Sequence, residues 1–350
     1  MKADVIIVGG GPAGAILAWK LSKSYKVLVL DKRHILDEKR IHREEKCCGG
    51  MLDHSAQQEL AHLGLPLPAR IVMDPQIFTV RAIDFDNRME RYYQRNYLNI
   101  DRARFDSWLL ALAAQRKNAQ VLEGVSAYEY TAEEDRVTVS FRREDGTRET
   151  AEGSFLIGCD GATSGVRRFA MKRYLLRYRE PKIYASIQEW HPVDKPLPYY
   201  GAMFDQKVSD FYSWIIPKTV SEDTASQEGS LPAGNYFLLG SAIPAEKSGK
   251  YGSVKERFEI LRKDMESRGF KVSHPAKVTG AAILRPRMFG GILSGGGRVF
   301  LCGEAAGLIS PSSSEGISFA MRSGEMLARA FGKGGDPDKI RGRYEKRLRP

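Results

Sequence analysis

A glycine-rich turn between two short apolar runs constrains the fold of this chain more than any other feature. Residues 4–8 read Asp-Val-Ile-Ile-Val, which is typical of a strand buried in a parallel sheet. Residues 9–14, Gly-Gly-Gly-Pro-Ala-Gly, lead into a helical pattern over residues 13–23. A second apolar run at residues 26–30 ends at Asp31. The pattern predicts a β-α-β unit whose first turn carries the G-x-G-x-x-G fingerprint of dinucleotide-binding folds.

Each glycine of this fingerprint has a structural role in binding a pyrophosphate. Gly9 permits a tight turn, Gly11 lets the pyrophosphate approach the backbone, and Gly14 lets the helix pack closely on the strand. The phosphates then lie at the positive end of the helix dipole, and the acid after the second strand binds ribose hydroxyls. The alternative is a glycine-rich turn without a ligand, which the flanking strand, helix and acid disfavour. The candidate ligands are Gly9, Gly11, Pro12, Ala13, Gly14, Asp31 and Lys32.

Length and composition indicate a folded chain of about two domains. The 350 residues are 42% hydrophobic and 28% charged, which excludes global disorder and coiled-coil rods. The four cysteines form no C-x-x-C, and neither they nor the six histidines show metal-binding spacing. We therefore expect no metal and a reducing, cytoplasmic environment. The glycine-rich turn interrupts the apolar stretch 5–19 and no run of about 18 apolar residues follows, so neither a signal peptide nor a membrane span is predicted.

The chain carries a net charge of +11, which suits an acidic partner such as a nucleotide, a nucleic acid or an anionic membrane face. Basic residues gather at residues 166–180 and in the tail 332–350. Such runs are usually solvated faces, although the tail could contact the inner face of a membrane peripherally. No nucleic-acid reader motif accompanies the charge, so we expect no nucleic-acid partner.

Two further segments place an acid and glycines directly after an apolar run. Residues 158–164 read Gly-Cys-Asp-Gly-Ala-Thr-Ser, in which the Asp-Gly pair alone could be a simple turn. Residues 300–307, Phe-Leu-Cys-Gly-Glu-Ala-Ala-Gly, precede a helical pattern at 315–331. Glu304 could bind a ribityl hydroxyl, and amides at the helix start could stabilise negative charge on a reduced flavin. The candidate ligands here are Asp160, Gly161, Gly303, Glu304, Gly307, Pro311, Gly316 and Ile317.

Together the three motifs resemble those of the FAD-dependent oxidoreductases of the aromatic-hydroxylase fold, in the same order and over nearly the whole chain. The resemblance implies FAD as the cofactor. The first motif would bind its pyrophosphate and adenosine ribose, the second would contact FAD, and the third would bind the ribityl chain and pyrophosphate. Residues 99–106 are similar to the helix start R-x-x-F-D of this superfamily, which would place Arg102 against FAD.

Finer features resemble the geranylgeranyl reductase family of this superfamily. Residues 48–50, Cys-Gly-Gly, resemble its C-G-G segment, and residues 212–218, Tyr-Ser-Trp-Ile-Ile-Pro-Lys, resemble its Y-x-W-x-F-P-K. Residues 303–320 are similar to its third motif. The resemblance implies reduction of isoprenoid double bonds by hydride transfer from reduced flavin. Three departures are Glu304 for the usual Asp, Ile216 for Phe, and Ser314 where Gly usually precedes Glu-Gly.

Four residues of these segments are candidates for catalysis or for substrate binding. Cys48 could lie beside the flavin with Gly49 and relay a proton, because a thiol holds a proton at neutral pH. It could instead be a small buried residue of a glycine-rich turn. Tyr212 and Trp214 would share one face of a strand, which could line an apolar substrate channel or pack as an ordinary sheet face. Lys218 could bind a substrate phosphate or lie in solvent.

The order of the apolar runs predicts an α/β fold. We expect a Rossmann-type FAD-binding domain, with a parallel sheet and a β-meander at residues 120–157, and an inserted substrate domain built on an antiparallel sheet. The predicted boundaries are residues 1–72, 98–175 and 280–331 for the FAD-binding domain, 73–97 and 176–279 for the substrate domain, and 332–350 for the basic tail.

We therefore expect an FAD-dependent enzyme that reduces carbon–carbon double bonds of a lipid-like isoprenoid substrate. The chain shows one Rossmann fingerprint, so we expect no separate nicotinamide-binding domain. The electrons would therefore come from NAD(P)H that docks transiently or from a small redox protein. One alternative is a flavin monooxygenase of an aromatic or polyketide, although Gly307 stands where many hydroxylases carry His. Another is a flavin halogenase, since residues 214–217 resemble its W-x-I-P, but Tyr212 replaces the first Trp of that motif. A flavoprotein that binds a ligand or partner without turnover is a further class.

Overall fold

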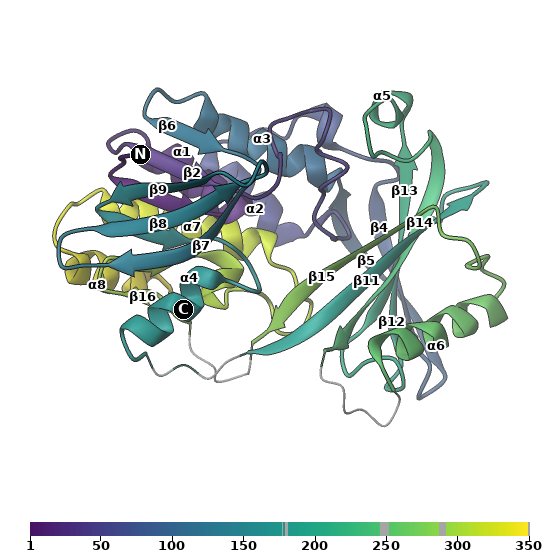
Figure 1. Ribbon diagram of the computed structural model, residues 1–350. Helices are drawn as coiled ribbons and strands as arrows, with labels where there is room; N and C mark the ends of the chain where they lie inside the picture. Colours follow the sequence, from purple (N-terminus) through teal and green to yellow (C-terminus); the bar gives the residue numbers. More distant parts are fainter. Residues whose placement is uncertain (177, 179–180, 246–251, 287–291, 349–350) are drawn as a thin grey trace. The chain divides into compact units, whose positions relative to one another are not determined.

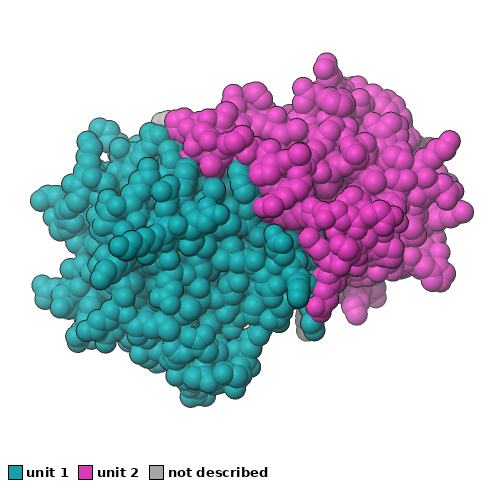
Figure 2. Space-filling model, turned by 90° about the horizontal axis from the view of Figure 1, so that it is seen from above, with its two compact units in different colours: residues 1–44, 105–181, 284–350 teal, residues 45–104, 182–283 magenta. Residues whose placement is uncertain are grey.

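The computed structural model describes residues 1–176, 178, 181–245, 252–286 and 292–348 (Figure 1). Small parts of the predicted FAD-binding domain, substrate domain and tail therefore lie outside the described residues. The chain divides into two compact units, which Figure 2 shows in different colours. Unit 1 comprises Met1–Glu44, Phe105–Pro181 and Leu284–Pro350, and unit 2 comprises Glu45–Arg104 and Lys182–Ile283.

These bounds differ from the predicted domain boundaries chiefly because residues 45–72 and 98–104 belong to unit 2, and the later boundaries move by a few residues, to 181 and 283. The reason is a strand pair that the sequence pattern did not reveal. Strand β3 (Met51–Leu52) pairs antiparallel with the end of β5 (Met89–Asn99), which joins the Cys-Gly-Gly segment to the large sheet of unit 2.

A six-stranded sheet forms the centre of unit 1. In spatial order its strands are β16 (Gly295–Gly296), β17 (Val299–Leu301), β10 (Phe155–Gly158), β1 (Val5–Val8), β2 (Val27–Leu30) and β6 (Ala119–Leu122). The five strands from β17 to β6 are parallel, and β16 is antiparallel to β17. Every residue of β1 and β2 is buried, which explains why these strands are apolar without alternation.

Helices cover one face of this sheet and a β-meander covers the other (Figure 1). Helices α1 (Pro12–Leu21) and α7 (Ile317–Phe331) pack so closely that a Cβ atom on Gly324 would lie 2.6 Å from the carbonyl oxygen of Ala13. Val139 and Phe141 of the meander share a buried cluster with Ile6 of β1. The predicted parallel sheet with a β-meander is thus confirmed. The meander comprises β7 (Val125–Ala132), β8 (Val137–Arg143) and β9 (Arg148–Gly153), and α4 (Gly165–Arg173) packs beside it.

The predicted basic tail contains a helix, α8 (Pro337–Leu348), that is anchored in unit 1. Ile340 and Tyr344 are buried, and the Tyr344 hydroxyl donates a hydrogen bond to the carbonyl oxygen of Leu301 at 3.1 Å. Leu301 ends β17, so this helix supports the strand that leads into the third sequence motif. The remaining elements associated with unit 1 are α3 (Arg102–Ala114), whose first three residues belong to unit 2, and the 3-10 turn η2 (Gly303–Ala306).

Unit 2 is built on an eight-stranded sheet. In spatial order its strands are β15 (Lys277–Arg285), β11 (Lys182–Val193), β14 (Gly234–Pro244), β13 (Ser213–Val220), β12 (Tyr200–Phe204), β4 (Ile77–Asp84), β5 and β3. The predicted antiparallel sheet is confirmed except that β12 and β4 run parallel. The unit also contains α2 (His54–Leu63), the 3-10 turn η1 (Ala69–Ile71), α5 (Glu222–Ala225) and α6 (Val254–Ser267).

The two faces of this sheet differ in chemistry. Phe258 and Leu261 of α6 pack with Ile215 on one face. Trp214 and Ile216, which alternate with Ile215 along β13, lie in a separate cluster on the opposite face. We call this second side the aromatic face, and its buried members are Ile77, Val80, Tyr184, Tyr200, Ala202, Phe211, Trp214, Ile216, Leu238 and Ala242. Across the described residues, no helix has the length and apolar character needed to cross a membrane.

We expect Tyr344→Ala to lower the free energy of unfolding by about 3–5 kcal/mol, because the change removes a fully buried aromatic ring and leaves the Leu301 carbonyl without its donor. Urea unfolding followed by circular dichroism measures this loss. Lys346→Ala on the exposed side of the same helix is the control and should change stability by less than about 0.5 kcal/mol. Equal unfolding midpoints for the two variants would show that α8 does not stabilise unit 1.

Candidate functional site

In the glycine-rich turn of unit 1, the packing of the protein itself requires Gly9 and Gly14 but not Gly11. Gly9 has φ +104°, and a Cβ atom there would lie 2.3 Å from the carbonyl oxygen of Cys159. A Cβ atom on Gly14 would lie 1.9 Å from the carbonyl oxygen of Gly9. At Gly11, which precedes Pro12 at the start of α1, a Cβ atom would meet nothing within 4 Å. This open space at a helix N-terminus fits a pyrophosphate that approaches the backbone.

Asp31 lies buried at the end of β2 and connects that strand to the turn. Its carboxylate accepts a hydrogen bond from the backbone N–H of Gly10 at 2.6 Å. It also accepts one from the backbone N–H of Arg33 at 2.8 Å and forms an ion pair with the Arg33 guanidinium. Lys32, between them, is exposed. The carboxylate is therefore held rigidly beside the turn, and its role toward a ribose stays a prediction.

The second and third motifs lie together in unit 1. Asp160 accepts hydrogen bonds from the backbone N–H groups of Gly165 at 2.8 Å and Val166 at 3.2 Å, so it caps the start of α4. Burial raises the pKa of this carboxyl. Arg167 donates to the carbonyl oxygens of Ala162 in the second motif and Ala305 in the third. The structure therefore brings both motifs together through one guanidinium group.

The third motif also reaches the first one. A Cβ atom on Gly303 would lie 3.0 Å from the Cβ atom of Ala13 at the start of α1. Glu304 accepts a hydrogen bond from the backbone N–H of Leu284 at 3.0 Å. Gly161, with φ +75°, has open space beside it, since its nearest neighbour within reach of a Cβ atom is Glu304 at 3.9 Å. Of the other candidate ligands, Gly307 ends η2 in the left-handed conformation, Pro311 lies exposed in a turn, and Gly316 and Ile317 start α7.

The departure at Ser314 has a local structural cost. Ser314 has φ +51°, a left-handed conformation that favours glycine, the residue that the resemblance implies at this position. Its backbone N–H donates to the carbonyl oxygen of Ser310, so a closed turn holds the residue in place.

In unit 2, the thiol of Cys48 is paired with a guanidinium group. Arg102 donates a hydrogen bond to its Sγ at 3.3 Å, and the backbone N–H of Gly50 donates another at 3.4 Å. Burial alone would raise the pKa of this thiol, but the positive charge of Arg102 and the two hydrogen bonds outweigh that effect and lower it below its ordinary value. The thiol of Cys48 is therefore held by two hydrogen bonds, and its role as a proton relay stays a prediction.

Lys218 is buried directly behind this loop. Only 2% of the residue is exposed, and its Nζ donates to the carbonyl oxygens of Gly50 at 3.1 Å and Ile100 at 2.8 Å. Burial lowers its pKa to about 8. The alternative that Lys218 lies in solvent is thus wrong. Its bonds to two carbonyls also count against a role as the ligand of a substrate phosphate.

Trp214 is connected to the Cys48 loop by a residue that the sequence analysis missed. Its Nε1 donates to Oε1 of Gln188 at 3.1 Å, and Nε2 of Gln188 donates to the carbonyl oxygen of Cys48 at 3.3 Å. Gly49 packs so closely on β13 that a Cβ atom there would lie 2.5 Å from Ile216. Tyr212 packs on Trp214 with ring centroids 5.9 Å apart. Strand β11 also contains Ser186, Glu189 and His191, so its sequence gave no signal that singled out Gln188.

The structure therefore assembles two groups of the predicted site residues. Unit 1 contains the three glycine-rich motifs with Asp31, Asp160 and Glu304. Unit 2 contains Cys48, Gly49, Arg102, Tyr212, Trp214 and Lys218.

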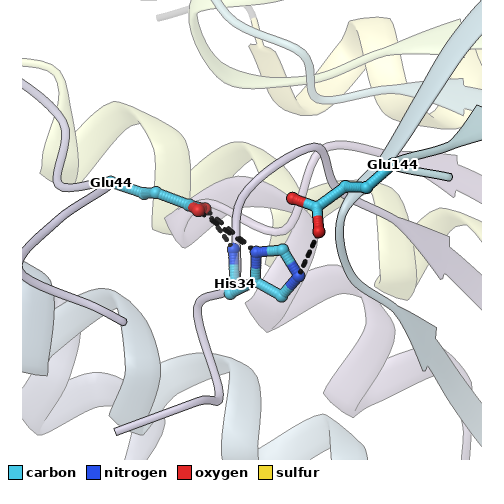
Figure 3. A group of neighbouring side chains, drawn as sticks. All are labelled: His34, Glu44 and Glu144. Atoms are coloured by element: carbon cyan, nitrogen blue, oxygen red, sulfur yellow. Dashed lines mark hydrogen bonds and ion pairs between the residues drawn. The ribbon is translucent and has the colours of Figure 1, made fainter. Parts of the chain in front are cut away.

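The structure also reveals a group of possible metal ligands that their sequence spacing concealed (Figure 3). The Nδ1 atom of His34 lies 3.2 Å from the Glu44 carboxylate, and its Nε2 lies 3.6 Å from Glu144. The guanidinium of Arg40 already pairs with both carboxylates and donates to Nε2 of His34 at 2.9 Å. Because Arg40 supplies the counter-charge, we interpret this group as a structural connection between the loop after β2 and the turn that follows β8.

Comparison with known proteins gives the family of this arrangement. A family model described as an FAD binding domain matches residues 2–174. The "Protein CbrA" sequences of Escherichia coli O157:H7 and Shigella dysenteriae are each 35% identical to this chain over 341 residues, which are 97% of this chain and 87% of those proteins.

Solved structures share the fold. A geranylgeranyl bacteriochlorophyll reductase-like protein from Thermoplasma acidophilum matches with a TM-score of 0.76 at 19% identity, over 99% of this chain and 83% of that one. The flavin-dependent halogenase CmlS matches with a TM-score of 0.69 at 18% identity, over 100% of this chain and 62% of that one. These comparisons confirm FAD as the cofactor and the aromatic-hydroxylase type of fold that the motifs predicted.

We expect Gly11→Ala to fold normally but to bind FAD at least about tenfold more weakly, because its Cβ atom enters the space that fits the pyrophosphate. Gly14→Ala should instead lower the free energy of unfolding, since its Cβ atom overlaps the Gly9 carbonyl. Urea unfolding of the apoprotein and fluorescence titration with FAD separate the two effects. Gly342→Ala, also without a neighbour within 4 Å, is the control. Unchanged FAD affinity in Gly11→Ala would refute this placement of the pyrophosphate.

We expect Arg102→Gln to raise the pKa of the Cys48 thiol, because the change removes the positive charge beside the thiolate. The rate of alkylation by iodoacetamide against pH, measured on the apoprotein, reports this pKa. Cys48→Ser identifies the contribution of Cys48 to the rate, and exposed Arg70→Gln controls for the loss of one charge. Identical pH profiles for the wild type and Arg102→Gln would contradict the pairing.

Proposed function

This chain belongs to the family of the CbrA proteins and is an FAD-dependent oxidoreductase, and we propose that it reduces carbon–carbon double bonds of an isoprenoid lipid. The observation that carries this proposal is the paired thiol of Cys48. A thiol with a lowered pKa, held by Arg102 beside the residues of β13, is suited to donate a proton to an apolar substrate. The resemblance of the Cys-Gly-Gly and Tyr-x-Trp segments to the geranylgeranyl reductases supports the same reaction.

The residues of unit 1 fit the cofactor. In the proposal, the turn at Gly11 and the N-terminus of α1 hold the pyrophosphate, and Asp31 binds the adenosine ribose. Glu304 and the first amides of α7, at Gly316 and Ile317, serve the ribityl and isoalloxazine parts.

Reduction of an alkene needs a hydride for one carbon and a proton for the other. Reduced FAD supplies the hydride when bound, and NAD(P)H or a small redox protein supplies the two electrons that reduce it. In the proposal, the S–H bond of Cys48 breaks as the second C–H bond forms. Arg102 and the N–H of Gly50 then stabilise the thiolate, which takes up a proton from water. The substrate chain packs on Trp214 and Tyr212 of unit 2.

The aromatic face is the second support for a lipid-like substrate. Trp214, Tyr200 and Val80 belong to one buried apolar cluster, and in the proposal the substrate chain packs at the Trp214 end of it. Gln188 connects the Trp214 indole to the Cys48 loop, which holds the proposed proton donor at one side of that cluster.

We expect the dithionite-reduced protein, freed of excess reductant, to be reoxidised anaerobically by geranylgeranyl diphosphate or a geranylgeranylated lipid. The lipid should gain the mass of two hydrogen atoms for each double bond reduced, which mass spectrometry detects. Cys48→Ser should bind FAD normally but reoxidise at least about tenfold more slowly, because a hydroxyl is a much weaker acid than the thiol. Reoxidation that waits for oxygen would instead indicate a monooxygenase or a halogenase.

A further inference from the structure

Strand β5 forms a long, exposed edge of the eight-stranded sheet of unit 2. It pairs along its length with β4, whereas β3, its other neighbour, pairs only with Leu98 and Asn99. Residues 89–96 of β5 are all exposed. Within the described residues, no strand lies beside this part of β5 on the side away from β4. An open edge of this length offers backbone donors and acceptors to a further strand.

The strand lacks two features that commonly protect such an edge. Residues 89–96 contain no proline, and the one irregularity in the pairing with β4 lies near the far end of the strand, between Ile77 and Thr79. Two neighbouring tyrosines on it are largely exposed, Tyr92 by 59% and Tyr93 by 47%. Large aromatic side chains beside an open edge are typical of a protein interface.

A second copy of this chain fits the edge in one register. Two copies of β5 can pair antiparallel about a two-fold axis perpendicular to the sheet, which keeps equivalent faces on the same side. When Tyr92 lies opposite Tyr92 of the second copy, Arg91 lies opposite Tyr93, and Glu90 lies opposite Gln94. Each opposition is favourable, because it joins two aromatic rings, a guanidinium with a ring, or a carboxylate with an amide donor.

The charged side chains of β5 disfavour the neighbouring registers. Because opposed residues of such a pair share a face, the next registers are centred on Tyr93 or on Arg91. Centring on Tyr93 would put Arg91 opposite Arg95, and centring on Arg91 would put this arginine opposite its own copy. Like charges that lie directly opposite each other destabilise a strand pair. The sequence of β5 is therefore self-complementary when the pair is centred on Tyr92.

We infer that this chain forms a two-fold dimer in which the β5 strands of two copies pair edge to edge, centred on Tyr92, and join the two eight-stranded sheets into one. Within one copy, Tyr92 already packs on Tyr199 with ring centroids 6.3 Å apart, and the guanidinium of Arg81 lies 5.8 Å from its ring. These contacts hold the ring in place before association, which lowers the entropy lost on binding. The inference does not depend on the proposed reaction, because it uses none of the residues around Cys48.

Sedimentation velocity of the FAD-loaded protein over a range of concentrations tests the dimer. We expect a wild-type Kd in the micromolar range, because a single strand pair buries less surface than an interface of standard size. Tyr92→Glu keeps a favourable neighbour in Arg81 on β4 but puts two carboxylates opposite each other at the axis, so it should weaken the dimer at least about tenfold. The control is Tyr128→Glu on β7 of unit 1, a similarly exposed tyrosine, which should dimerise as wild type does.

Tyr92→Lys tests the register. Alone it should also dimerise weakly, whereas an equimolar mixture with Tyr92→Glu should restore the dimer, because an ammonium group then faces a carboxylate at the axis. If either variant fails to fold by circular dichroism, oxidation of Tyr92→Cys replaces this test. That variant should form a disulfide-linked dimer, and Tyr93→Cys, which would face Arg91, should not.

Three results would overturn the inference. The first is a wild-type protein that stays monomeric at every concentration. The second is a Tyr92→Glu dimer as tight as the wild-type dimer, which would place the interface on another surface. The third is a failure of the mixture, or of the cross-link at position 92, to give the dimer, because the register would then be wrong.

Discussion

The geometry of the candidate site in unit 2 depends on the hydrogen bonds that the buried ammonium group of Lys218 donates. Its two hydrogen bonds join the carbonyl of Gly50, two residues after Cys48, to that of Ile100, two residues before Arg102. Holding both segments in place sets the distance between the thiol and the guanidinium. Burial makes this costly, since a pKa lowered from 10.5 to about 8 corresponds to about 3 kcal/mol. A neutral amine still has two N–H donors for the two carbonyls, so raising the pH through this range removes the buried charge without removing the connection.

In unit 1, glycines let backbone segments pack closely at some positions and leave open space for the cofactor at another. Gly14 lets α1 approach the first turn, and Gly324 lets α7 approach α1. Neither contact tolerates a side chain, so the glycines are explained by the protein's own packing. Gly11 differs because nothing in the protein occupies the space beside it. That contrast separates a glycine required by the fold from one that the proposed ligand requires.

Elements that local sequence patterns encode could be predicted from the sequence, whereas contacts between residues far apart along the chain could not. The β-α-β unit, the meander and the second sheet follow from apolar runs and turn residues, and the three motifs identified FAD. The burial of Lys218 could not be predicted, because its partners lie 168 and 118 residues away along the chain. Gln188 was missed for the same reason, since it joins Cys48 and Trp214 across separations of 140 and 26 residues. Pairing of β3 with β5 likewise moved the boundary between the units.

The side chains of unit 2, more than its fold, bear on which reaction this flavoprotein performs. A reductase-like protein and a halogenase match the whole chain with similar TM-scores, so the fold is common to both chemistries. The fold provides a broad sheet, and successive residues along each strand lie on its two opposite faces. Helix α6 packs on one face, and a buried cluster rich in aromatic residues lies on the other. In the proposed reduction, the thiol that is paired with Arg102 and connected through Gln188 to Trp214 supplies the proton that the second alkene carbon requires.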